Sequence, residues 1–284
     1  MKQRALQIFT PREAYLLVTA SMVLGLFVTI TFQGVLAGME NIAFLERLSI
    51  LLGELTILVP SFFILRQRGI IWHEVIPLRK ISPVTLIMAA VIVGGAIGLV
   101  SVFEVIILPY FPVPDFIRQL ELEMTQSTFL DNLVLIIAGT VIAPFVEEFV
   151  FRGLLQQSLF YRYGSILPAM VIPTVIFSLF HVAYLFYLPA LMELIALALL
   201  LAWLMVKTGN LLIPVIVHGL FNLSSFFGVF ITAMEETTTL TELGTPWIVT
   251  SVLLATAGWV YFKNMPVVVH DDVYLIPPLK EEQT

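Results

Sequence analysis

The sequence has no cysteine and few charged residues. Without cysteine the chain can form neither a disulfide framework nor a thiolate metal site, and it has no cysteine nucleophile. Charged residues make up 12% of the 284 positions, against about 25% in a typical soluble domain, whereas hydrophobic residues make up 59%. The mean hydropathy is +1.00. This composition predicts an all-α, polytopic integral membrane protein.

Clustered positive charge and internal repeats are also missing. The 14 Lys and Arg residues are scattered singly or in small groups, so they predict no nucleic-acid partner. The lack of an internal repeat disfavours a secondary transporter, because many transporter folds are built from repeats. The partner that this composition predicts is the lipid bilayer.

Long apolar runs predict about eight transmembrane helices. Their expected bounds are 14–36, 48–65, 84–108, 132–161, 166–187, 189–206, 211–230 and 247–262. With the N-terminus in the cytoplasm, only Arg47 and Arg118 of the basic residues fall on the far side, as the positive-inside rule requires. We therefore predict a cell-membrane location with both termini cytoplasmic.

Three segments follow from this pattern. Residues 1–130 hold the N-terminal helices and a connector, in which 115–131 is predicted to contain a short interfacial helix. Residues 131–230 hold the polar residues at membrane depth. Residues 231–284 hold the last helix and a cytoplasmic tail.

Glu147, Glu148 and Arg152 lie inside the fourth apolar run. An ionised side chain at the bilayer centre costs at least ~2.5 kcal/mol, so such residues are rare and usually face the bundle interior or water. Glu148 and Arg152 are i, i+4 neighbours in the order that favours an ion pair. Glu147 points about 100° away on a helix and is left without a partner there. The simpler alternative is an ion pair that holds two helices together.

Two of the four histidines also lie in predicted spans, each with a companion four residues away. Phe177 precedes His181, and Asn222 follows His218. On a helix, His218 and Asn222 share a face, so both can donate a hydrogen bond to one acceptor. The alternative for each histidine is an ordinary packing role.

These residue types match the needs of peptide hydrolysis, which are an activated water, a proton carrier and donors aimed at an oxyanion. Glu147 can act as the base, and His181 can orient or protonate. His218 and Asn222 can form the oxyanion hole. Pro144 and Pro214 lie four residues before Glu148 and His218, and kinks at these prolines favour a small wet cavity beside the polar groups.

The three motifs together, Glu147-Glu148-x-x-x-Arg152, Phe177-x-x-x-His181 and His218-x-x-x-Asn222, resemble those of the CPBP family of intramembrane proteases. This family includes type II CAAX prenyl endopeptidases and bacterial Abi or bacteriocin-immunity proteins. The resemblance covers about 131–227. It implies helices around a catalytic cavity that opens to the cytoplasm. It also implies that Glu147 and His181 activate water while His218 and Asn222 stabilise the oxyanion, with Glu148, Arg152 and Phe177 in support.

Zinc is an open alternative for the same residues. Glu147, His181 and His218 have the donor types of a catalytic zinc site with one open position. The sequence has no His-Glu-x-x-His helix, which would support zinc independently. We therefore expect no obligatory cofactor, with zinc possible.

Three functions compete. The first is an intramembrane endopeptidase acting on a membrane-associated substrate, with a prenylated CAAX-type protein as one option. The second is a non-catalytic immunity or peptide-binding protein with the same fold. The third is a proton-coupled transporter that uses Glu54, Glu147 and Glu193, although Glu54 and Glu193 have simpler roles as interhelical hydrogen-bond partners.

Overall fold

The computed structural model describes residues 9–39, 42–71, 76–232 and 240–267. Within these ranges the chain is helical, and its only β-type pairing is an isolated bridge between Leu78 and Asn210. The helices are α1 (Pro11–Leu36), α2 (Ala43–Gln67), α4 (Pro83–Ile107), α5 (Asp115–Gln126), α6 (Phe129–Ile137), α7 (Ala143–Glu148), α8 (Gln156–Tyr163), α9 (Ile166–Phe180), α10 (Leu188–Thr208), α11 (Leu212–Thr232), α12 (Leu240–Leu243) and α13 (Thr245–Asn264). Two π-helical segments, η1 (Ala138–Ile142) and η2 (Phe149–Leu155), and one 3-10 helix, η3 (Val182–Phe186), complete the set.

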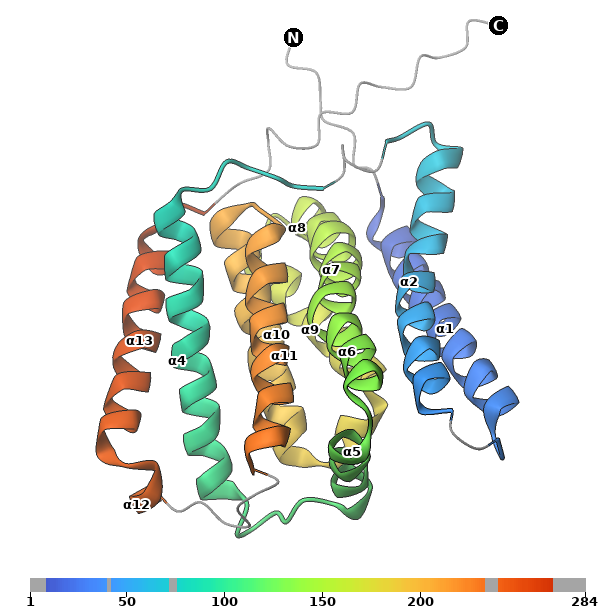
Figure 1. Cartoon of the computed structure of the whole chain (residues 1–284). Helices are drawn as coiled ribbons and strands as arrows, with labels where there is room; N and C mark the ends of the chain where they lie inside the picture. Colours follow the sequence, from blue (N-terminus) through green and yellow to red (C-terminus); the bar gives the residue numbers. More distant parts are fainter. Residues whose placement is uncertain (1–8, 40–41, 72–75, 233–239, 268–284) are drawn as a thin grey trace, which may run out of the picture.

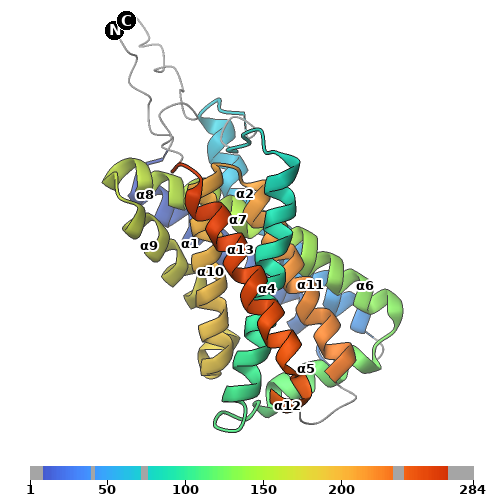
Figure 2. The ribbon, with the colours of Figure 1, turned by 90° about the vertical axis from the view of Figure 1, so that its left-hand side faces the viewer.

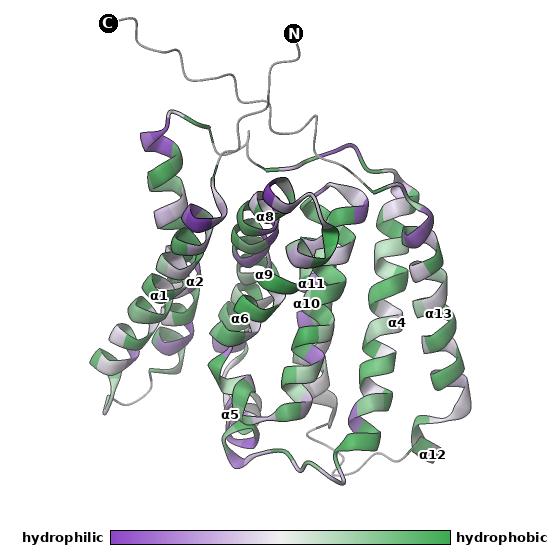
Figure 3. Cartoon of the chain, turned by 180° about the vertical axis from the view of Figure 1, so that it is seen from behind, coloured by the Kyte–Doolittle hydropathy of each residue, from purple (hydrophilic) through white to green (hydrophobic). Residues whose placement is uncertain are grey.

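The protein is an all-α integral membrane protein, as the composition predicts. In the part of the chain that the structure describes, six helices are long and apolar enough to cross a bilayer: 11–36, 43–67, 83–107, 129–160, 188–208 and 245–264. Two shorter apolar helices, 166–180 and 212–228, account for the other predicted spans. Apolar residues cover most of the long helices, and polar residues gather near helix ends and on α5 (Figure 3).

The helices form three groups (Figure 1). The hairpin of α1 and α2 stands on one side, the pair α4 and α13 on the other, and the helices from α6 to α11 lie between them. The first described residues and the end of α13 lie at the same end of the bundle. The predicted interfacial helix is α5, which lies at the opposite end.

Small residues bring α4 and α13 into close contact, and the two helices cross each other (Figure 2). A Cβ atom added at Gly95 would overlap the backbone of Ala255, and one added at Gly98 would overlap Ser251. Interfaces between membrane helices are enriched in such residues because they let backbones approach closely. The glycine-rich third span is therefore a packing surface, as its composition indicates.

The predicted fifth span is interrupted. Helix α9 ends at Phe180, and His181 has a non-helical backbone with φ −88° and ψ 63°. A 3-10 turn follows, and α10 begins with Pro189 in its first turn. The predicted span of 166–187 is therefore α-helical only as far as Phe180, because the chain has to turn before α10. His181 consequently lies at the end of a helix and not on its side.

Candidate active site

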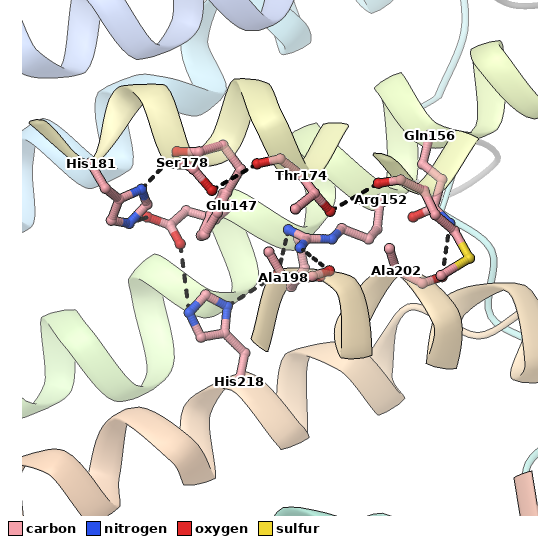
Figure 4. Close-up of polar contacts among 12 residues, drawn as sticks. Glu147, Arg152, Gln156, Thr174, Ser178, His181, Ala198, Ala202 and His218 are labelled. Atoms are coloured by element: carbon pink, nitrogen blue, oxygen red, sulfur yellow. Dashed lines mark hydrogen bonds and ion pairs between the residues drawn. The ribbon is translucent and has the colours of Figure 1, made fainter. Parts of the chain in front are cut away.

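The three sequence motifs meet in the middle group of helices. Glu147 and Glu148 lie on α7, Arg152 on η2, His181 at the end of α9 and His218 on α11 (Figure 4). Glu148 and Arg152 are fully buried, and Glu147 and His218 have relative exposures of 6% and 3%. The side chain of His181 is the most open of the five, with 21% of its surface exposed.

Two π-helical segments flank the short helix that carries both glutamates. η1 ends directly before α7, and η2 begins directly after it. Pro144 lies in the first turn of α7 and has no N–H to donate to the carbonyl of Thr140, so regular α-helical bonding cannot continue there. Insertions of this kind inside α-helices often occur at functional sites. Here they set the direction of Glu147 relative to the neighbouring helices.

Helix α11 packs closely against the backbone carbonyls of η1. A Cβ atom added at Gly219, next to His218, would overlap the carbonyl oxygen of Thr140. Asn222, one turn further along α11, donates its side-chain N–H to the carbonyl of Gly139 at 2.8 Å. These two contacts fix the position of α11, and with it His218, against the helix that carries Glu147.

We expect Gly219→Ala to lower both stability and any activity of this site, because the added methyl must push α11 away from η1. Overpacking of this kind costs about 1–3 kcal/mol. The matched control is Gly228→Ala on the same helix, where a Cβ meets no atom within 4 Å. Thermal unfolding of both variants in detergent checks this, and equal melting temperatures would show that the contact is unimportant.

The Glu148 carboxylate is the centre of a buried polar network. Its Oε1 accepts a hydrogen bond from Nη1 of Arg152 at 2.9 Å and lies 3.1 Å from Nδ1 of His218. Arg152 also donates from Nη2 to the carbonyl of Ala198 at 3.0 Å. The predicted ion pair is therefore present, and it has a third member in His218. It also ties η2 to α10, so the alternative of an ion pair holding helices together describes part of what Glu148 and Arg152 do.

The ring of Phe177 packs against Arg152 and the two histidines. The guanidinium carbon of Arg152 lies 5.0 Å from the centre of the Phe177 ring, which is a cation–π arrangement. The ring centre is also 4.3 Å from that of His181 and 6.2 Å from that of His218. One aromatic side chain thus contacts three polar residues of the site and limits their movement.

Glu147 lies between the two histidines. Its Oε1 is 3.9 Å from Nε2 of His181, and its Oε2 is 3.7 Å from Nε2 of His218. Nδ1 of His181 lies 2.9 Å from the carbonyl oxygen of Phe177. Both imidazoles therefore have an acceptor next to Nδ1 and turn Nε2 toward the same carboxylate. The site brings these three predicted residues together.

Asn222 is placed differently from the other predicted residues. The sequence predicts two donors, His218 and Asn222, aimed at one acceptor. In the structure one N–H of the Asn222 amide is already used by Gly139, so at most one remains for another acceptor. Asn222 is partly exposed, in contrast to His218.

Several contacts of the site were not predicted. Ala198 and Ala202 on α10 present carbonyls to Arg152 and Gln156, with Gln156 donating to Ala202 at 2.8 Å. The ring centre of Tyr184, on η3, lies 5.9 Å from that of His181. Backbone acceptors leave no signal in the sequence. Gln156 does leave one, because it is a polar residue one turn after Arg152 in an apolar run.

The donor types at this site are those that zinc binds. The two Nε2 atoms approach different oxygens of Glu147, and the described ranges contain no group of three His, Asp or Glu side chains disposed to hold a metal ion. We therefore derive no step of the chemistry from a metal.

A comparison with protein families agrees with the motifs. Residues 129–224 match the family described as type II CAAX prenyl endopeptidase Rce1-like. The match covers about a third of the chain, and it begins with α6 and includes all seven motif residues. No curated protein and no solved structure matches the chain. The predicted resemblance is thus confirmed for the segment that builds the site, and at the family level it supports an intramembrane protease.

Proposed function

Because residues 129–224 are similar to type II CAAX prenyl endopeptidases, we propose that this protein is an intramembrane endopeptidase that hydrolyses a peptide bond of a membrane-associated substrate. The observation that carries the proposal is the position of Glu147, a buried carboxylate faced by the Nε2 atoms of His181 and His218. Burying ionisable groups among apolar helices costs free energy, so such groups usually mark functional sites.

The hydrogen bond of His181 explains how water would be activated. A neutral imidazole next to an acceptor carries its proton on that side, so Nδ1 of His181 donates and Nε2 keeps a lone pair. This Nε2 and Oε1 of Glu147 are then both acceptors, 3.9 Å apart, which is too far for a direct hydrogen bond. A water molecule placed between them donates to both sides. Glu147 takes its proton as the water attacks the carbonyl carbon.

The oxyanion requires a donor on the opposite side of the carbonyl. His218 can donate from Nε2 only as an imidazolium, because its Nδ1 proton is already directed at Glu148. The Glu148 carboxylate supplies the counter-charge for that form. The second N–H of the Asn222 amide completes the oxyanion hole, and Glu147 passes its proton to the leaving amine. Glu148, Arg152 and Phe177 are positioning residues in this scheme.

The substrate and its approach follow from the location of the site. A peptide that reaches residues buried among apolar helices must itself be membrane-anchored or lipidated, and a prenylated CAAX-type protein is one such substrate. We also propose that both termini are cytoplasmic, as the distribution of basic residues predicts, and that the substrate enters from that side.

Hydrolysis in water enriched in oxygen-18 tests the function. The purified protein, in nanodiscs, would be incubated with a library of farnesylated peptides, and the products would be analysed by mass spectrometry. We expect one oxygen-18 atom in the new C-terminal carboxylate of the N-terminal fragment. Binding of the peptides without any cleavage would favour the immunity or peptide-binding function, and proton-dependent uptake of a solute would favour the transporter.

A further inference from the structure

Helix α2 brings another carboxyl group to this site. It packs against α6, η1 and α7, and Phe62 on α2 lies 6.0 Å from Phe149 between ring centres. Ile57, one turn after Glu54, belongs to the same buried hydrophobic cluster as Val146, the neighbour of Glu147. The N-terminal hairpin, which lies outside the segment with the family match, therefore forms one wall of the site.

Glu54 has an unsatisfied oxygen in this wall. Its Oε2 is shielded from solvent and has no hydrogen-bond partner within the described ranges. Buried polar atoms are nearly always paired, so an unpaired one needs an explanation. The Glu54 carboxyl interacts electrostatically with the acidic group of Glu147.

The arginine of the site is already bonded to other groups. Arg152 donates to Glu148 and to the carbonyl of Ala198. Its electrostatic interactions are with Glu148 and Glu147. A positively charged group brought in by a ligand would give the buried Glu54 oxygen the partner that it lacks, since buried carboxylates are stable only when they are paired.

We propose that Glu54 is a substrate-binding residue that pairs with a basic side chain carried by the peptide close to the scissile bond. This inference rests on the proposed function and specifies its substrate class: membrane-anchored peptides with a lysine or arginine near the cleavage point. Glu54 takes no part in bond breaking. It favours peptides with a basic side chain over peptides with a neutral one, because only the basic side chain can form an ion pair with it.

The test compares farnesylated peptides that differ at one position, which is either lysine or norleucine. Norleucine keeps the aliphatic chain and removes the ammonium group. Successive peptide pairs carry this lysine or norleucine at successive positions on either side of the cleaved bond. At one of these positions we expect kcat/KM of the native protein to be about tenfold higher for lysine. Glu54→Gln should cleave both peptides at the rate of the norleucine peptide.

The matched control is Glu193→Gln, which changes another glutamate within an apolar helix, one that interacts electrostatically with Glu104. This variant should keep the preference for lysine. A native protein without preference at any position would overturn the inference. So would a Glu54→Gln protein that cleaves both peptides more slowly but keeps the preference, because a purely structural role predicts that result.

A binding measurement separates this inference from the proposed function. Fluorescence anisotropy of labelled peptides would be measured with Glu147→Gln alone and combined with Glu54→Gln. We expect the lysine peptide to bind about tenfold more weakly to the double variant, and the norleucine peptide to bind equally to both. If the native protein cleaves nothing, the proposed function fails, and this measurement still decides the role of Glu54. Equal binding of the lysine peptide to both variants would contradict it.

Discussion

Glu147→Gln should abolish peptide cleavage while leaving the fold intact. Gln has nearly the same shape, but its amide cannot take a proton from water. Loss of a general base typically costs about 10² to 10⁴ in rate. Because Glu147 forms no ion pair with Arg152, the variant should melt at nearly the same temperature as the native protein. The measurement is kcat on a cleaved peptide, together with a thermal unfolding curve.

The control for this variant is again Glu193→Gln, which removes from α10 a carboxyl group that interacts electrostatically with Glu104. It should keep full activity on a neutral peptide. If Glu147→Gln retained more than a few percent of the native rate, Glu147 would not be the base, and one of the histidines would have to take that role.

Arg152→Met should be the most destabilising change in this network. It leaves the fully buried Glu148 carboxylate without its cation and the Ala198 carbonyl without its donor. Breaking a buried ion pair from one side costs about 3–5 kcal/mol. For a chain of this size that would lower the melting temperature by roughly 10 °C. Thermal unfolding in detergent measures the effect.

The double variant Glu148→Gln with Arg152→Met tests whether the unpaired Glu148 carboxylate causes the loss of stability. Removing both charges leaves no isolated buried ion, so the double variant should be more stable than Arg152→Met alone. A double variant that is less stable than either single variant would show that the two side chains stabilise the fold independently. Both variants should lose activity, because His218 loses the positioning that Glu148 provides.

Much of the fold follows from apolar length alone. The predicted spans agree with the observed helices to within a few residues, because about 20 apolar residues are needed to cross a bilayer and polar residues mark the ends. The exception is the fifth span, where the apolar run continues beyond His181 into η3. Hydropathy does not distinguish a helix from a turn when the residues of both are apolar.

The sequence predicts contacts between side chains of the site, but it does not predict contacts between a side chain and the backbone. Spacing indicated the Glu148–Arg152 pair, which the structure shows as a hydrogen-bonded ion pair at 2.9 Å. Spacing alone could not indicate that Asn222 bonds to the carbonyl of Gly139, since that carbonyl depends on the π-helical turn of η1. The place of Glu54 beside Glu147 depends on how α2 packs, which no local pattern encodes.

Removal of metal tests the central claim most directly, namely that Glu147 and His181 activate water without a metal ion. The purified protein would be treated with a strong chelator, its residual zinc would be measured, and its kcat on a farnesylated peptide would be compared with that of Glu147→Gln. We expect the chelated protein to keep its activity and the variant to have none. Loss of activity on chelation, with recovery when zinc is added, would contradict the account and make Glu147, His181 and His218 metal ligands.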